Sequence, residues 1–357
     1  MRIVYDVSPL AHPLTGVGNY VRGSLAGLAE AAAGRHEILA FAPTSFAGRN
    51  AIQQALVGID VELKLVPLPF SQRWRDAWSR LGKPPLERVV GAFDVFHYSD
   101  WMYPAQAGGV RATTIHDLVP LRFPDWVTPK TRAMHGAKYA DVARTADLVL
   151  VNSEFTGRDV IERLGVPAER VKVAHPGVKE VFRPDGERAD LGRPYVLTVA
   201  TLEPRKNLAT LVEAHRLLGG DVLLAVAGGT GWGDQPELRG PNVVRLGFVS
   251  DPELARLYRG AAAAVYPSRF EGFGIPIIEA MACGVAVVAS SHESMDEAAG
   301  HAAVRADPES PEALAAAIED ALARREALVP PGLEHARRFT WQAAGEIFLS
   351  GYEGAAP

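Results

Sequence analysis

The sequence predicts an α/β protein built from two doubly wound domains, and three observations support this prediction. The chain has 357 residues, which exceeds what one hydrophobic core usually organises. Short runs rich in Val, Leu and Ile alternate with helical patterns in both halves, as in parallel sheets covered by helices. A polar stretch with prolines separates the two series of runs. We therefore expect domains at 1–182 and 195–335, joined by a linker at 183–194.

The expected strands follow one another along the chain, and helical patterns lie between them. In the first domain they cover 2–7, 37–42, 61–67, 94–99, 112–118, 148–153 and 171–177. In the second domain they cover 195–201, 222–229, 243–249, 263–268 and 285–290. From 311 onward the chain reads as helices, with a break expected at 330–332, where two prolines precede a glycine. The last segment, 336–357, is expected as a helix that crosses back and packs on the first domain.

Composition and charge exclude several classes of protein. Cys283 is the only cysteine, so no disulfide forms within the chain. The amino terminus has no long apolar run, and no later run reaches the ~18 residues of a spanning helix, so we expect a cytoplasmic protein. The net charge is −5, with 21 basic against 18 acidic residues in 1–180 and 16 against 24 in 181–357. This overall sign disfavours nucleic acid as the main partner.

The stretch EGFGIPIIEAMACG places Glu271 and Glu279 eight positions apart in an otherwise apolar segment. Pro276 suits the first position of a helix and Gly284 suits its left-handed end, which predicts a helix over 275–283. Glu271 then lies in a loop that follows a strand, where open α/β sheets bind ligands. A helix amino terminus favours a diphosphate, and carboxylates accept hydrogen bonds from sugar hydroxyls. Each glutamate taken alone is equally explained as a solvated charge.

Two cations follow another expected strand in TLEPRKN, where Arg205 and Lys206 lie at a turn into a helix. Fixed cations stabilise the charge that develops on a leaving diphosphate. Metal-dependent sugar transfer usually needs carboxylates that hold Mg²⁺ or Mn²⁺, yet the sequence contains no Asp-x-Asp. The alternative is that both cations are solvated surface charges.

Near the amino terminus, Gly16 and Gly18 form a Gly-x-Gly after the first strand, which permits a close approach of backbone and ligand. A dinucleotide fingerprint is disfavoured because Val21 occupies the third glycine position. His116 stands at the carboxyl end of an expected strand. It is either a ligand contact or a structural histidine that caps the strand.

The stretch from Glu271 to Glu279 resembles the Glu-x7-Glu signature of retaining GT-B glycosyltransferases of the GT4 type. Similarity extends through VNSEFTGRDV, TLEPRKNLATLVEA, VAGGTGW and LGFVSDPELARLYRGAAAAVYPS, and so covers most of the chain. TGVGNY, IHDLVPL and LEPRKN are most similar to bacterial mannosyltransferases that build surface polysaccharide. The resemblance implies two facing Rossmann-like domains, with the acceptor on the first domain and a nucleotide sugar on the second.

The resemblance also implies a role for each residue of the second domain. Glu279 would hold the nucleotide ribose, and Glu271 would contact the hydroxyls of the donor sugar. The backbone amides of Phe273 and Gly274 would lie against the sugar or the diphosphate. Arg205 and Lys206 would bind the diphosphate in place of a metal, so that no cofactor is required.

In the first domain the resemblance implies that His116 binds the donor sugar near its reacting carbon, while Gly16 and Gly18 complete the donor site. The predicted reaction transfers a hexosyl group, mannose from GDP-mannose, to a hydroxyl of a glycan or lipid-linked glycan in polysaccharide synthesis, with retention of configuration. The alternatives are a UDP-sugar-dependent transferase of the same family, a nucleotide-sugar 2-epimerase, and a sensor that binds nucleotide sugar without turnover.

The stretch FSQRWRDAWSRLGK predicts an amphipathic helix with Trp74 and Trp78 on its apolar face and Arg73, Arg75 and Arg80 outside it. Basic amphipathic helices bind anionic membrane surfaces, and a lipid-linked acceptor would lie at the inner membrane. The same spacing equally predicts a helix that buries its tryptophans in the core of its own domain.

Overall fold

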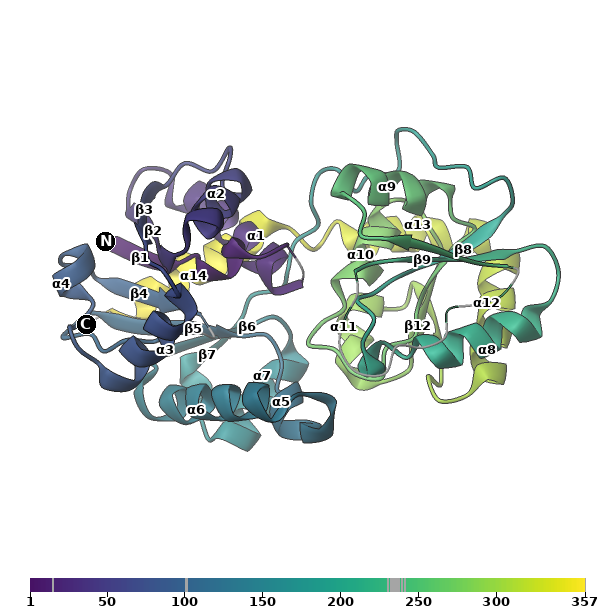
Figure 1. Ribbon diagram of the computed structural model, residues 1–357. Coiled ribbons are helices and arrows are strands. Elements are labelled where there is room, and N and C mark those ends of the chain that lie inside the picture. The colour runs from purple at the N-terminus through teal and green to yellow at the C-terminus, as the bar shows by residue number, and fades with distance from the viewer. Residues whose placement is uncertain are drawn as a thin grey trace. The chain divides into compact units, whose positions relative to one another are not determined.

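The computed structural model describes residues 1–14, 16–99, 102–229, 231, 238, 240 and 242–356. The chain divides into two compact units. Unit 1 comprises Met1–Gly177 and Thr340–Pro357, and unit 2 comprises Val178–Phe339. In each unit helices cover the faces of a parallel sheet (Figure 1). None of the helices in the described part of the chain combines the length and apolar character needed to cross a membrane.

Within the described residues, unit 1 contains a seven-stranded parallel sheet in the order β3-β2-β1-β4-β5-β6-β7. Its strands are β1 Arg2–Asp6, β2 Glu37–Thr44, β3 Glu62–Pro67, β4 Val95–Tyr98, β5 Val110–Ile115, β6 Leu148–Val151 and β7 Val171–Val173. The apolar runs of the sequence form these strands because both faces of the sheet are buried under helices. The order reverses between β1 and β4, as in a doubly wound fold.

The α-helices of unit 1 are α1 Gly16–Ala32, α2 Phe46–Ala55, α3 Ser71–Leu81, α4 Glu87–Val90, α5 Val119–Arg122, α6 Pro129–Thr145, α7 Glu154–Leu164 and α14 Trp341–Ala355. Short 3-10 turns lie at Ser8–Ala11, Pro124–Trp126 and Ala168–Arg170. The last helix, α14, confirms the predicted return of the carboxyl-terminal segment, since it packs in the core of unit 1 beside α1 (Figure 1).

Close packing of α14 on α1 depends on two glycines. A Cβ built on Gly27 would lie 1.8 Å from the carbonyl oxygen of Trp341, and one built on Gly345 would lie 2.0 Å from the carbonyl carbon of Gly27. The two backbones therefore approach more closely than any side chain would allow. The fully buried Phe348 and Tyr352 continue the contact toward the sheet, where the Tyr352 hydroxyl lies 2.8 Å from His97 Nδ1.

Unit 2 contains a six-stranded parallel sheet, among the described residues, in the order β10-β9-β8-β11-β12-β13. Its strands are β8 Tyr195–Val199, β9 Leu223–Ala227, β10 Val243–Gly247, β11 Ala263–Tyr266, β12 Val287–Ser290 and β13 Ala303–Ala306. Sequence reasoning missed β13, whose short pattern of AVRA carries a charge. The order reverses between β8 and β11, which is the Rossmann arrangement.

The α-helices of unit 2 are α8 Leu208–Leu218, α9 Asp251–Gly260, α10 Ile275–Ala282, α11 Asp296–Ala299, α12 Pro311–Ala323 and α13 Arg325–Ala336, with 3-10 turns at Pro204–Lys206 and Glu293–Met295. The break expected at 330–332 is wrong. Helix α13 continues through both prolines, and the break falls at Arg324 instead. Packing overrides the local signal here, because Gly332 is buried against Met281 of α10.

The segment 183–194, expected as a linker, lies within unit 2. The Arg259 guanidinium of α9 holds it by donating hydrogen bonds to the backbone carbonyls of Glu187 at 2.7 Å and of Arg183 at 3.2 Å. The backbone N–H of Ala189 also donates to the Arg256 carbonyl, at 2.9 Å. These contacts attach the segment to the end of α9.

Candidate functional site

Four polar residues of interest lie just beyond the carboxyl ends of β8 and β11, the neighbouring strands at which the order of the second sheet reverses. Glu203, Arg205 and Lys206 follow β8, and Glu271 follows β11. Open α/β sheets bind ligands at such a reversal, because the loops of the two strands separate and leave a crevice. The topology therefore brings together two motifs that lie 65 residues apart in sequence.

The carboxylate of Glu271 bridges both cations. Its Oε2 accepts a hydrogen bond from Arg205 Nη1 at 2.5 Å, and its Oε1 accepts one from Lys206 Nζ at 2.6 Å. Glu271 is 6% exposed and Lys206 is also buried, so these are charge-assisted hydrogen bonds in a region of low dielectric. The alternative that Arg205 and Lys206 are ordinary solvated charges is therefore wrong.

Three further residues fix this cluster and were not singled out from the sequence. Glu203 Oε2 accepts from Arg205 Nε at 2.9 Å, and the Tyr266 hydroxyl accepts from Lys206 Nζ at 3.0 Å. The Ser294 hydroxyl accepts from the backbone N–H of Glu271 at 3.2 Å. Glu203 stands within the LEPRKN motif, so its position beside the cations offered a signal, whereas the other two are brought in only by the fold.

The charges of the cluster are set by burial and by the mutual attraction of its members. Burial raises the pKa of Glu271, but Arg205 and Lys206 more than offset this and lower it to about 2. Burial and then repulsion from Arg205 lower the pKa of Lys206, while Glu271 opposes the change. Burial raises the pKa of Glu203, against the attraction of Arg205. Glu271 is thus ionised at neutral pH and balances one of the two cations.

Helix α10 begins where the sequence predicts. Gly274 is its N-cap residue, with φ of 104°, a conformation that glycine adopts readily. The Phe273 side chain is buried with its ring centroid 5.3 Å from that of Phe339. Because this ring belongs to the core, Phe273 can offer only its backbone to a ligand, as the predicted role requires.

Glu279 lies inside α10 and is also 6% exposed, but its surroundings differ from those of Glu271. No described residue makes a hydrogen bond or ion pair with its carboxylate. Burial raises the pKa of Glu279 to about 7, with Lys179 opposing and Asp251 adding to the rise. These two residues pair with each other at 2.7 Å. Lys179 carried no sequence signal.

In unit 1, Gly16 and Gly18 occupy the first turn of α1 rather than a separate loop. Nothing lies within 4 Å of a Cβ built on Gly16, so the start of the helix is open there. His116 follows β5 directly, and its ring meets the Tyr20 ring edge-on at 5.0 Å between centroids. Tyr20 belongs to α1, one helix turn beyond Gly16 and two residues beyond Gly18, so His116 contacts the helix whose first turn holds both glycines.

Helix α3 forms over the predicted segment, but the expected faces are only partly correct. Trp74 is 57% exposed, whereas Trp78 is half-buried beside the Phe41 ring, so the stripe is divided between solvent and core. Arg75 was expected outside and is 2% exposed. It faces the buried Asp6 at the end of β1, a long-range partner that helical spacing does not reveal.

Potential metal ligands are dispersed in the part of the chain that the structure describes. No group of three or more His, Cys, Asp or Glu side chains there could hold a metal ion. The glycine-rich VAGGTGW stretch lies partly outside the described residues.

The two sheets and their covering helices form an architecture that is found in solved structures of other proteins. Sucrose-phosphate synthase (tll1590) from Thermosynechococcus elongatus superposes with a TM-score of 0.75 at 21% identity, over 99% of this chain and 98% of that one. Anabaena Alr3699/HepE in complex with UDP and glucose superposes with a TM-score of 0.72 at 18% identity, over 99% and 100%. These similarities show the GT-B fold.

Sequence comparison identifies the family. Residues 14–180 match "Glycosyltransferase Family 4" and residues 178–340 match "Glycosyl transferases group 1". O-antigen chain mannosyltransferase B of Escherichia coli is 30% identical, over 99% of this chain and 100% of that protein. The chain therefore belongs to the GT4-type glycosyltransferases, and it is a hexosyltransferase.

Proposed function

We propose that unit 2 binds a nucleotide sugar and that the enzyme transfers its hexosyl group to a hydroxyl with retention of configuration. One observation carries this proposal: Arg205 and Lys206 are held by Glu271 at the reversal point of the sheet, beside the amino terminus of α10. Two fixed cations and a helix amino terminus suit a diphosphate.

Each side chain then has a defined task. Arg205 and Lys206 bind the diphosphate, and Glu271 keeps them in place while it accepts hydrogen bonds from the donor sugar. The backbone amides of Phe273 and Gly274 contact the sugar or the diphosphate. Glu279, whose buried carboxylate makes no hydrogen bond with described residues, accepts hydrogen bonds from the ribose hydroxyls.

We assign His116, Gly16 and Gly18 of unit 1 a part in donor binding as well, as the family resemblance implies. In the proposed reaction the bond between the anomeric carbon and the diphosphate oxygen breaks, and the acceptor oxygen bonds to that carbon on the same face. The departing phosphate oxygen takes the proton of the acceptor hydroxyl. Arg205 and Lys206 stabilise the charge that grows on the diphosphate, so the reaction proceeds without a metal ion.

Mannose from GDP-mannose is the proposed donor, with a glycan or lipid-linked glycan of a polysaccharide as acceptor. Similarity to an O-antigen chain mannosyltransferase along the whole chain supports this choice. A UDP-sugar is the alternative, favoured by the similarity of fold to a protein that binds UDP and glucose.

The decisive experiment is calorimetric titration of the metal-free protein with GDP-mannose, UDP-glucose, GDP and UDP. We expect one nucleotide family to bind, and Lys206→Ala and Glu279→Ala to weaken its affinity at least tenfold. Arg216→Ala is the matched control, because Arg216 is an exposed cation on α8 that pairs with Glu213. Equal affinity in all four proteins, or no binding of any nucleotide, would contradict the proposal.

We further propose that α3 contacts the anionic membrane surface that holds the lipid-linked acceptor. The exposed apolar side chains of Phe70, Trp74 and Leu81 lie beside the exposed cations Arg73 and Arg80, a combination typical of interfacial helices. Sedimentation with phosphatidylglycerol vesicles should recover the wild type and lose Trp74→Ser/Leu81→Ser. Equal recovery of both proteins, or none of the wild type, would refute this contact.

A further inference from the structure

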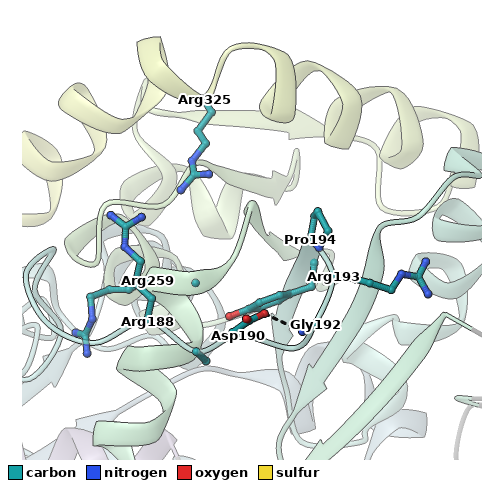
Figure 2. Close-up of a pocket in the computed structure, with 10 residues that line it drawn as sticks. Arg188, Asp190, Gly192, Arg193, Pro194, Arg259 and Arg325 are labelled. Atoms are coloured by element: carbon teal, nitrogen blue, oxygen red, sulfur yellow. Dashed lines mark hydrogen bonds between the residues drawn. The ribbon is translucent and has the colours of Figure 1, made fainter.

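A pocket in unit 2 lies at the opposite end of the sheet from the loops of the proposed donor site. It has a volume of about 360 Å³ and is bordered by the start of β8, the end of α9 and the start of α13. Figure 2 shows its lining residues. They are Arg188, Ala189, Asp190, Gly192, Arg193, Pro194, Tyr195, Arg259, Gly260 and Arg325.

Of the four arginines in this lining, three have no anionic partner in the part of the chain that the structure describes. Arg188 and Arg325 make no hydrogen bond or ion pair with described residues. Arg259 is 8% exposed, and its bonds go to uncharged carbonyls, those of Glu187 and Arg183. Figure 2 shows the side chains of Arg259 and Arg325 extending toward one another from α9 and α13. Both side chains therefore contribute positive charge to the lining of one pocket.

The fourth arginine and the only carboxylate of the lining do not cancel this charge. Arg193 turns away, because its guanidinium donates to the Asp221 carbonyl at 3.0 Å and to Asn242 Oδ1 at 3.1 Å. Asp190 supplies one negative charge, and its Oδ1 already accepts from the Gly192 backbone N–H at 2.8 Å. Among the described residues the lining thus holds three guanidinium groups without an anionic partner against a single carboxylate, and a bound anion would balance this excess of positive charge.

We propose that this pocket binds a small phosphate-bearing anion. Guanidinium groups recognise phosphate through paired N–H donors in a fixed plane, and several of them around one pocket favour a ligand with more than one negative charge. The buried Arg259, fixed by two backbone carbonyls, provides a rigid donor at the base. The volume lies at the lower end of the roughly 300–1,000 Å³ typical of small-molecule sites, which limits the ligand to a compact molecule.

The site is separate from the donor crevice. Tyr195, in the lining, begins β8, while the donor cations follow the other end of that strand. A strand of this length spans about 15 Å at roughly 3.3 Å per residue, which is more than one diphosphate can bridge. The pocket therefore binds its ligand independently of the proposed donor.

Titration calorimetry with pyrophosphate at fixed ionic strength tests this site. The variant Arg188→Gln/Arg325→Gln changes two side chains that make no hydrogen bond or ion pair with the described residues, so it should remain folded. Pyrophosphate that still binds to the donor-site variant Lys206→Ala must bind at this pocket. We expect the double variant to bind pyrophosphate at this pocket at least tenfold more weakly than the wild type does. Arg324→Gln is the matched control, because this neighbouring arginine pairs with Asp320 on α12 and does not line the pocket.

Two results would overturn the proposal: pyrophosphate binding that Lys206→Ala abolishes entirely, or equal binding by the double variant and the wild type. Titration with GDP separates this inference from the donor assignment. The double variant should bind GDP as the wild type does, since its substitutions lie at the other end of β8. If the wild type binds pyrophosphate through the arginines but binds no nucleotide, the donor assignment fails and the pocket stands.

Discussion

Glu271 and Glu279 are equally buried and lie eight residues apart, yet their surroundings have opposite effects on their charge. Glu271 accepts hydrogen bonds from two cations, which lower its pKa to about 2 despite the effect of burial. No described residue donates a hydrogen bond to the Glu279 carboxylate, and burial raises the pKa of Glu279 to about 7. Burial alone therefore does not determine the pKa of a carboxyl group. Its charged and hydrogen-bonded partners determine whether the ionised form stabilises the fold or destabilises it.

The comparison assigns different stages of ligand binding to the two residues. Glu271 is already paired with Arg205 and Lys206 in the free protein, so in the proposed donor site it would organise the cations before the donor binds. The Glu279 carboxylate makes no hydrogen bond with the described residues, and in the same proposal the ribose would supply them. A group that costs stability in the free protein and improves binding is common at functional sites.

The largest expected effect is that of Glu271→Ala. The substitution leaves Arg205 and Lys206 without their shared counter-charge in a buried place, so we expect a loss of about 3–5 kcal/mol in the free energy of unfolding at pH 7. Because the folded pKa is lowered, wild-type Glu271 contributes this stability above about pH 4.5 and loses it as the pH falls toward 2. Urea denaturation at pH 7 measures the loss, and a change below about 1 kcal/mol would show that the ion pairs are not required.

A second, opposite effect is expected for Glu279→Gln. Between about pH 4.5 and 7 the folded protein holds a proton on Glu279 that the unfolded chain has released, so wild-type stability falls as the pH rises through this range. Removing the titrating group should stabilise the protein by up to about 3 kcal/mol at pH 8 and have little effect near pH 4.5.

Urea denaturation of the wild type and Glu279→Gln at pH 5 and pH 8 measures the difference in their free energy of unfolding. It checks the sign of this difference and the pH range over which it appears. A difference that is the same at the two pH values would mean that Glu279 does not titrate in the folded protein. Nucleotide affinity should change in the other direction, since the glutamine cannot supply a charged acceptor to the ribose.

The smallest effect is expected at an exposed pair near the same loop. Arg269 donates two hydrogen bonds to Glu309, at 2.6 and 3.0 Å, and one to the Pro204 carbonyl at 2.9 Å, but the Arg269 and Glu309 side chains are 32% and 59% exposed. We expect Arg269→Ala to cost about 0–1 kcal/mol, with the loss decreasing in high salt. A loss as large as that of Glu271→Ala would remove the contrast between buried and exposed pairs.

Much of this site could be predicted because its signals are local. Pro276 and Gly284 bound α10 in the sequence as they do in the structure, and the apolar runs locate β8 and β11, the strands that Arg205 and Glu271 follow. Motif spacing was sufficient to predict that these residues lie in loops at the carboxyl ends of strands. Such loops lie together when their strands are neighbours in the sheet.

What could not be predicted depends on distant partners. The burial of Arg75 follows from Asp6 on another element, and the proximity of Lys179 to Glu279 follows from the path of the chain into unit 2. The helix through Pro330 and Pro331 is fixed by packing against α10 and overrides the usual effect of proline. Local patterns contain no information about such contacts.

The position of α14 in unit 1 determines the order in which the chain can fold during synthesis. Unit 2 is continuous in sequence, so the ribosome supplies all of its core before α14 emerges. The core of unit 1 lacks the Phe348 and Tyr352 side chains until that moment. A nascent chain therefore holds a complete unit 2 and an incomplete unit 1, and translation that stops before Trp341 would leave the exposed α1 surface as a target for chaperones or proteases.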